Sequence, residues 1–121
     1  MGLGNETADP ASKGARMETD PQNTWTWEED TQTGTVRISG EVDFSSSPGV
    51  KKRFKKFIKN SKGAVDLDLG GLTYLDSSGL AVLIEARRNL KEKERSLKVT
   101  ALHAQAEKIF KLTQVMELFG L

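Results

Sequence analysis

A strand that runs through a short polar turn into a helix sets the strongest constraint on how this chain folds. Residues 65–69, Val-Asp-Leu-Asp-Leu, alternate apolar and acidic side chains. The helix expected from about Ser77 to Glu94 carries an apolar stripe, made up of Leu80, Leu83, Ile84 and Leu90. Alternation places the apolar side chains on one face of the strand, and helical spacing does the same for the stripe. We therefore expect the strand and helix to pack together, with the turn exposed at one end.

All the strands that the sequence predicts alternate, and none is a continuous apolar run. They are residues 24–28, 35–39, 64–69 and 97–100. This pattern is typical of a sheet that is buried on one face only. Three helices are expected, at 48–60, about 77–94 and about 104–112, while 40–44 and 70–75 are interpreted as loops or short turns. The order β-β-α-β-α-β-α predicts an α/β fold, with a small mixed sheet of about four strands and three or so helices packed mainly on one face.

The chain divides into a tail and one domain. Residues 1–23 contain almost no large apolar side chain, so they cannot bury enough surface to offset the entropy lost on ordering. We expect a disordered N-terminal tail over 1–23 and a single domain over 24–121, a length that suits a modest core.

Composition argues against several classes of function. The 121 residues include no cysteine and one histidine, His103, which argues against disulfides, thiolate metal sites and a serine–histidine pair. The paired carboxylates Asp66 and Asp68 lie on the polar face of a strand without a third ligand, so no metal and no cofactor is expected. The net charge of +1 does not indicate direct nucleic-acid binding. No apolar run reaches the roughly 18 residues of a membrane span and no signal peptide precedes the domain, so a cytoplasmic location is expected.

The helix at 48–60 combines an apolar face with many cations. The apolar face contains Val50, Phe54, Phe57 and Ile58, and the cations are Lys51, Lys52, Arg53, Lys55, Lys56 and Lys59. One interpretation is a solvated face whose lysine stems cover apolar surface. The other is an electrostatic docking patch for an acidic partner or an anionic surface. Nucleic acid is less favoured, because the two phenylalanines are needed in the core.

The turn Asp76-Ser77-Ser78-Gly79 has three interpretations. A serine could cap the following helix, which contributes about 1 kcal/mol. Ser77 could act as a nucleophile, but His103 has no evident acidic partner and the G-x-S-x-G context is missing. A serine could instead accept a phosphate, which would add roughly −1.5 to −2 charges at a helix N-terminus. Spacing alone does not separate capping from phosphorylation.

The run from Leu75 to Leu83, Leu-Asp-Ser-Ser-Gly-Leu-Ala-Val-Leu, resembles the signature of the STAS family of sulfate-transporter and anti-sigma factor antagonist domains. The segments 37–43 and 106–110, followed by Leu118-Phe119, are similar to other parts of that family's pattern. The resemblance covers about 25–121 and implies a bacterial signalling protein that is not an enzyme. It implies that Ser77 is phosphorylated by an anti-sigma kinase, that the unphosphorylated form binds this anti-sigma factor, and that a phosphatase restores it. The docking surface carried over by the resemblance is Asp43, Asp76, Ser77, Ser78 and Gly79.

A second function stays open within the same resemblance. Short STAS proteins also act as cytoplasmic subunits of ABC transporters for membrane phospholipids, where the domain docks on the ATPase. The chain ends sooner than typical antagonists, which favours this alternative, while the intact Asp-Ser-Ser-Gly motif favours the antagonist.

Overall fold

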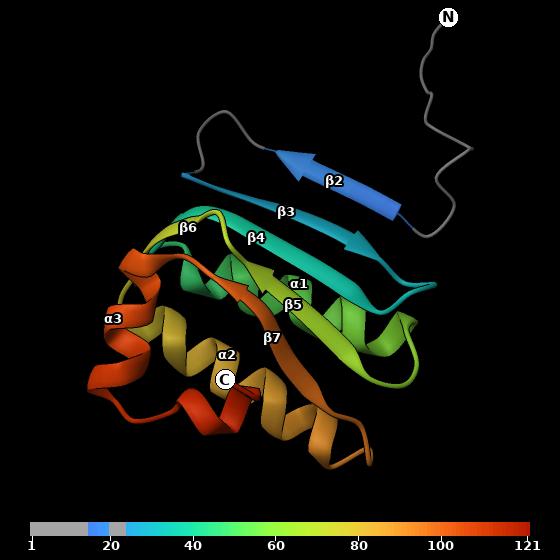
Figure 1. Ribbon diagram of the computed structural model, residues 1–121. Coiled ribbons are helices and arrows are strands. Elements are labelled where there is room, and N and C mark those ends of the chain that lie inside the picture. The colour runs from blue at the N-terminus through green and yellow to red at the C-terminus, as the bar shows by residue number, and fades with distance from the viewer. Residues whose placement is uncertain (1–14, 20–23) are drawn as a thin grey trace, which may run out of the picture.

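The computed structural model describes residues 15–19 and 24–121, which form one layer of sheet and one layer of helices (Figure 1). The elements, in chain order, are β2 (Ala15–Thr19), β3 (Trp25–Asp30), β4 (Thr35–Val42), α1 (Ser47–Asn60), β5 (Val65–Leu69), β6 (Leu72–Leu75), α2 (Ser77–Lys91), β7 (Leu97–Leu102), α3 (Ala104–Leu112) and the 3-10 turn η2 (Met116–Phe119). None of the helices in these ranges is long and apolar enough to cross a bilayer.

The sheet is mixed, with strand order β2-β3-β4-β5-β7 and with β6 paired to the end of β4. The strands β2, β3 and β4 are antiparallel, whereas β5 and β6 pair with β4, and β7 with β5, in parallel. The three α-helices lie on one face of the sheet, as Figure 1 shows. The predicted mixed α/β architecture is therefore confirmed.

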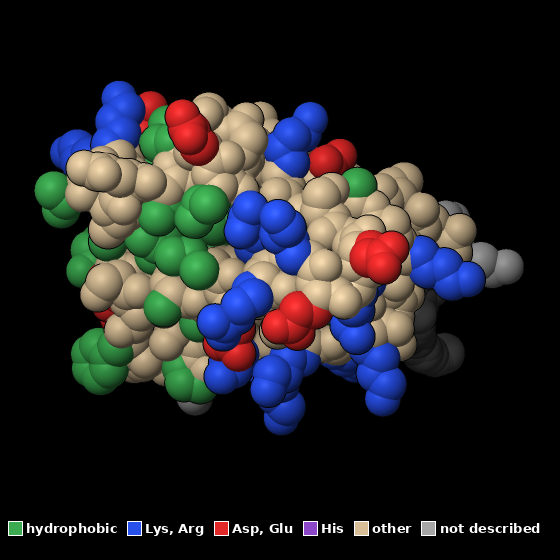
Figure 2. Space-filling view, turned by 90° about the horizontal axis from the view of Figure 1, so that it is seen from below, with side chains coloured by type: hydrophobic (Ala, Val, Ile, Leu, Met, Phe, Trp, Pro, Cys, Tyr) green, Lys and Arg blue, Asp and Glu red, His purple; other side chains and the backbone are tan. Residues whose placement is uncertain are grey.

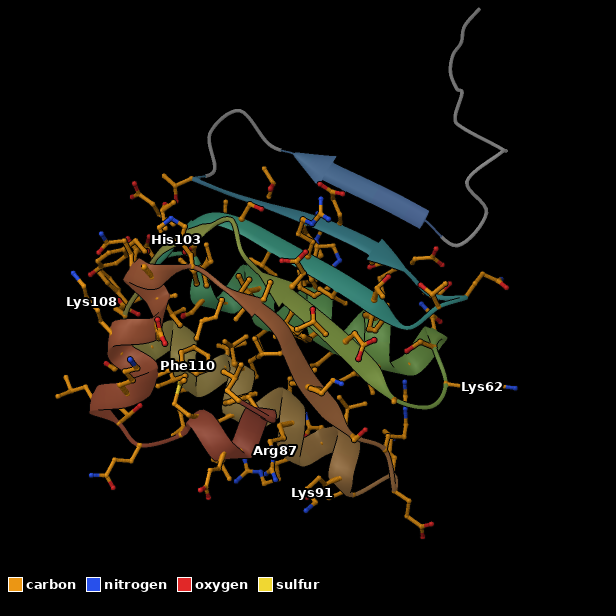
Figure 3. All side chains as sticks on the ribbon, in the orientation of Figure 1. Lys62, Arg87, Lys91, His103, Lys108 and Phe110 are labelled. Carbon is orange, nitrogen blue, oxygen red and sulfur yellow. The ribbon has the colours of Figure 1, made fainter. Side chains whose placement is uncertain are left out.

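Alternation in the strands directs one set of side chains into a core between the two layers. Trp27 is fully buried, and its ring meets that of Phe54 edge-on with centroids 4.9 Å apart. In the C-terminal part of the chain, the ring of Phe110 from α3 packs against that of Phe119, with centroids 5.3 Å apart (Figure 3 labels Phe110). The predicted apolar faces of α1 and α2 are buried, except that Ile84 is half-buried.

The opposite face of the sheet is polar, as the alternation predicts. Arg37 forms ion pairs with Glu28 on one side, at 3.8 Å, and with Asp68 on the other, at 3.2 Å. Asp68 also accepts a hydrogen bond from the Gly70 N–H. Over the described ranges, no group of three or more histidine, aspartate or glutamate side chains could hold a metal ion. The carboxylates of β5 thus belong to a charged row across the exposed sheet face.

The sheet has six strands, more than the four or so expected. Residues 72–75 form β6 instead of a loop, and 40–42 extend β4 instead of forming a polar loop, because these two segments pair with each other. In β6 only the two end residues are buried, so no alternation marked it. Within the predicted tail, residues 15–19 form β2 beside β3. Residues 1–14 and 20–23 lie outside the described residues, so disorder in those segments stays a prediction.

Candidate functional site

The candidate site forms where β4 and β6 end side by side. Val42 and Leu75, the last residues of these strands, are register partners in the parallel pair. Parallel strands end at the same edge of a sheet, so Asp43 and Asp76 both follow at that edge. The structure therefore brings the residues expected at a docking surface together on two adjacent segments, the β4–α1 loop and the start of α2.

Asp76 connects the two segments. Its Oδ1 accepts a hydrogen bond from the Gly79 N–H at 3.0 Å, which makes it the N-cap of α2. Its Oδ2 accepts one from the Phe44 N–H in the other loop, also at 3.0 Å. The Asp76 N–H donates to the Val42 carbonyl at 3.3 Å. One carboxylate thus fixes both the start of α2 and the position of the neighbouring loop.

Asp43 organises its own loop. Its Oδ1 accepts hydrogen bonds from the Ser45 hydroxyl at 2.7 Å and from the Ser45 N–H at 2.9 Å. The hydroxyl bond, with further bonds from Ser45 and Ser46, stabilises the ionised carboxylate and lowers the pKa of Asp43 below its ordinary value. Ser46 occupies the N-cap position of α1, but its side chain makes no cap bond, and its Oγ accepts the Asp43 N–H instead.

The two serines of the turn do not cap α2, because Asp76 takes that role. Ser77 is exposed and Ser78 is half-buried. Nothing in the described part of the chain hydrogen-bonds to the Ser77 hydroxyl, or accepts from the N–H groups of Ser77 and Ser78. These N–H groups lie at the positive end of the helix dipole. The capping interpretation of the serines is therefore wrong, and an unbonded hydroxyl remains next to free donors.

Gly79 lets α2 start close to the sheet. A Cβ at this position would come 2.5 Å from Leu75 Cδ1 and 3.0 Å from Val42 Cγ1. Real Cβ contacts are longer, so a side chain here would push the start of α2 away from the ends of β4 and β6. The glycine of the motif has a packing role beneath the surface that Ser77 presents.

Exposed apolar side chains lie around the turn, and sequence patterns alone did not predict them. Phe44 is 72% exposed and Tyr74 is 50% exposed, and Leu112 of α3 is also exposed. An open groove lies between β6 and α3, lined by Thr73, Tyr74, Leu75, Gln105, Lys108, Ile109 and Leu112. Figure 2 shows hydrophobic side chains gathered at this end of the molecule, on the left in both Figures 1 and 2. Exposed apolar surface of this kind commonly marks a protein contact. The feature of the sequence that could have indicated this surface is Phe44, an aromatic residue between the polar residues Asp43 and Ser45.

The single histidine has a structural role. His103 precedes α3, and its Nδ1 accepts a hydrogen bond from the Gln105 N–H at 3.0 Å (Figure 3). This bond caps the N-terminus of α3. The ring nitrogen in that bond is not available as a general base.

Comparison with known proteins places the chain in a family. The family model described as "Mlab, STAS domain" matches residues 25–120. The chain belongs to this STAS family. It is 25% identical over 91 residues to the anti-sigma-B factor antagonists of Listeria monocytogenes serovar 1/2a and Listeria innocua serovar 6a, which covers 75% of this chain and 80% of each relative.

Solved structures of similar fold agree with the family assignment. An anti-sigma factor antagonist from Mycobacterium paratuberculosis superposes with a TM-score of 0.64 at 23% identity, covering 87% of this chain and 80% of that one. The anti-sigma factor antagonist SpoIIAA in its unphosphorylated form superposes with a TM-score of 0.61 at 16% identity, covering 86% of this chain and 84% of that one. At these identities the likeness establishes the fold, and the predicted STAS resemblance is confirmed.

Proposed function

We propose that this chain is an anti-sigma factor antagonist that acts in the cytoplasm and binds an anti-sigma kinase through the surface around Asp76, Ser77, Ser78 and Gly79, with Asp43 at its edge. The observation that carries the proposal is the exposed Ser77 hydroxyl, without a hydrogen-bond partner in the described chain, between two loops that Asp76 holds together. The names of the Listeria relatives support the assignment of the partner class. Exposed Phe44 and Tyr74 supply the apolar contact area that a specific interface needs.

Phosphorylation of Ser77 is the proposed switch. A phosphate adds about −1.5 to −2 charges at the first turn of α2, where the free N–H groups and the helix dipole tolerate it. The domain therefore stays folded. The same charge lies next to the Asp76 carboxylate and on a surface that must lose its water on docking, so it disfavours the complex. Removal of the phosphate by a phosphatase restores binding.

The proposal is one of binding and not of catalysis. The His103 ring caps α3, and no described cluster of carboxylates resembles a metal centre. Ser77 is then the acceptor of a phosphoryl group that another protein supplies, and it needs no activating base of its own.

Binding to the anti-sigma kinase encoded in the same genome tests this proposal by isothermal titration calorimetry. Ser77→Asp is expected to weaken the complex by at least about 30-fold, since an unpaired charge at a desolvated interface costs about 2 kcal/mol or more. Ser77→Ala keeps the surface uncharged and binds within about threefold of the unmodified protein. Ser96→Asp is the matched control, because it adds the same charge at an exposed serine just before β7 and outside the proposed surface, and it is expected to bind like the unmodified protein. Equal affinity of the Ser77→Asp and unmodified proteins would contradict the switch.

The transporter subunit is the second proposal. The matching family model is described only as "Mlab, STAS domain", and the STAS resemblance extends to short domains that dock on ABC ATPases. In that case the chain co-purifies with the ATPase, and Ser77→Asp leaves the complex intact. The response to this one substitution separates the two functions.

A further inference from the structure

Helix α1 carries a stripe of exposed lysines on the side away from the sheet. Lys52, Lys55, Lys56 and Lys59 are all exposed and are spaced i, i+3, i+4 and i+7, which places them on one helical face. The apolar face of α1, which contains Phe54 and Phe57, is buried against the core. The fourteen residues of α1 include no aspartate or glutamate.

The stripe is not neutralised from within the described chain. Lys51 pairs with Glu85 of α2 at 3.4 Å, but it lies outside the stripe. No acidic side chain of residues 15–19 and 24–121 forms an ion pair with the four stripe lysines. Like charges three and four residues apart repel each other and destabilise a helix. An anionic surface laid against α1 would relieve that repulsion.

Positive charge is concentrated on the helix side although the net charge is only +1. The carboxylates of Glu28, Asp66 and Asp68 lie on the opposite, exposed face of the sheet. Lys91 on α2 points away from the sheet, and so does Arg87 (Figure 3). Figure 2, which looks onto the helix layer, shows Lys and Arg side chains over much of this face beyond the hydrophobic end, with Asp and Glu side chains among them. The charge separation orients the molecule with its helices toward a negative surface.

The composition of the stripe indicates which negative surface fits. Specific protein contacts rely on aromatic or arginine anchors, and lysine is depleted in them. Single-stranded nucleic acid requires stacking aromatics. The exposed residues of α1 include neither aromatics nor arginine; besides the stripe they are Pro48, Gly49 and Asn60. A lipid bilayer with anionic headgroups needs only a cluster of basic side chains.

We propose that the lysine stripe of α1 docks this domain peripherally on an anionic lipid surface. The apolar face of α1 is committed to the core, so the helix binds through charge and does not insert. Each lysine near such a surface strengthens binding about fivefold, so four lysines together contribute a few hundred-fold. The attraction acts over about 8 Å at physiological ionic strength and is lost at high salt. The proposal does not depend on the function of Ser77.

The test is co-sedimentation of the full chain with vesicles of phosphatidylcholine alone or mixed with phosphatidylglycerol, at low, physiological and high salt. The protein is expected to bind the mixed vesicles at low and physiological salt, and to be released at high salt. A variant with Lys52→Gln, Lys55→Gln, Lys56→Gln and Lys59→Gln is expected to bind a few hundred-fold more weakly, at about fivefold per lysine. Replacing the same four lysines with arginine preserves binding.

The matched control changes four exposed lysines outside α1, Lys93, Lys98, Lys108 and Lys111, to glutamine. Both glutamine variants change the net charge from +1 by −4, to −3. Retained binding by the control supports the proposal, whereas equal loss in both variants shows that only net charge matters and overturns it. Failure of the unmodified protein to bind the mixed vesicles, or stripe-dependent binding to duplex DNA without vesicle binding, also overturns it. Circular dichroism verifies that each variant is folded.

Discussion

Replacing Asp76 with alanine is expected to destabilise the domain by about 2–3 kcal/mol. The substitution removes the N-cap bond to the Gly79 N–H, which contributes about 1 kcal/mol. It also removes the bond from the Phe44 N–H, a hydrogen bond to a charged group that contributes about 1–2 kcal/mol at this half-buried position. For a domain of this size, the loss corresponds to a melting temperature lower by about 8–12 °C.

Asp76→Asn separates the two contributions. Asparagine is as good an N-cap as aspartate, so the bond to Gly79 is retained. Its second polar atom is an amide donor that cannot accept from the Phe44 N–H, so a loss of about 1 kcal/mol is expected. Urea unfolding followed by the fluorescence of the buried Trp25 and Trp27 measures both variants. A loss below about 0.5 kcal/mol for Asp76→Ala, or equal losses for the two substitutions, would refute the bridging role.

Three further substitutions test other parts of the structure. Gly79→Ala is expected to cost about 1 kcal/mol in urea unfolding, because the strain against Val42 exceeds the gain in helix propensity; a more stable variant would contradict the close approach. The lowered pKa of Asp43 gives stability that is present above its ordinary value of 3.8 and lost as the pH falls through the folded-state pKa. Unfolding free energies between pH 5 and pH 2.5 should therefore fall less steeply for Asp43→Asn, and equal slopes would argue against the Ser45 bonds. Arg95 donates to the carbonyls of Ile58 and Gly63 and to Ser61 Oγ, so thermal melts of Arg95→Ala should show a loss of about 2–3 kcal/mol, and a loss within 0.5 kcal/mol would contradict this.

The helices and the alternating strands could be predicted because their signals are local. The helix at 104–112 has the predicted bounds, and the apolar faces of α1 and α2 follow from spacing alone. The strand β6 could not be found in this way, since its four residues have the burial pattern buried, exposed, exposed, buried. Its existence depends on pairing with the end of β4, a contact between segments about thirty residues apart.

The sequence could suggest which residues form the candidate site, but not how they are hydrogen-bonded to one another. The family resemblance named Asp43 and the turn from Asp76 to Gly79, and the structure brings them to one edge of the sheet. The bond from the Phe44 N–H to Asp76 joins two loops, and no spacing rule reports such a contact. The same applies to the choice of Asp76 over a serine as the cap of α2, because aspartate and serine have similar cap preferences.

Mass spectrometry of the protein after incubation with its anti-sigma kinase and ATP tests the central proposal most directly. The proposal predicts one added phosphoryl group, located on Ser77, and none on the Ser77→Ala variant. It also predicts that the modified protein keeps its circular dichroism spectrum, since the start of α2 accommodates the charge. An unmodified Ser77, or a phosphate on Ser78 instead, would contradict the assignment of Ser77 as the switch.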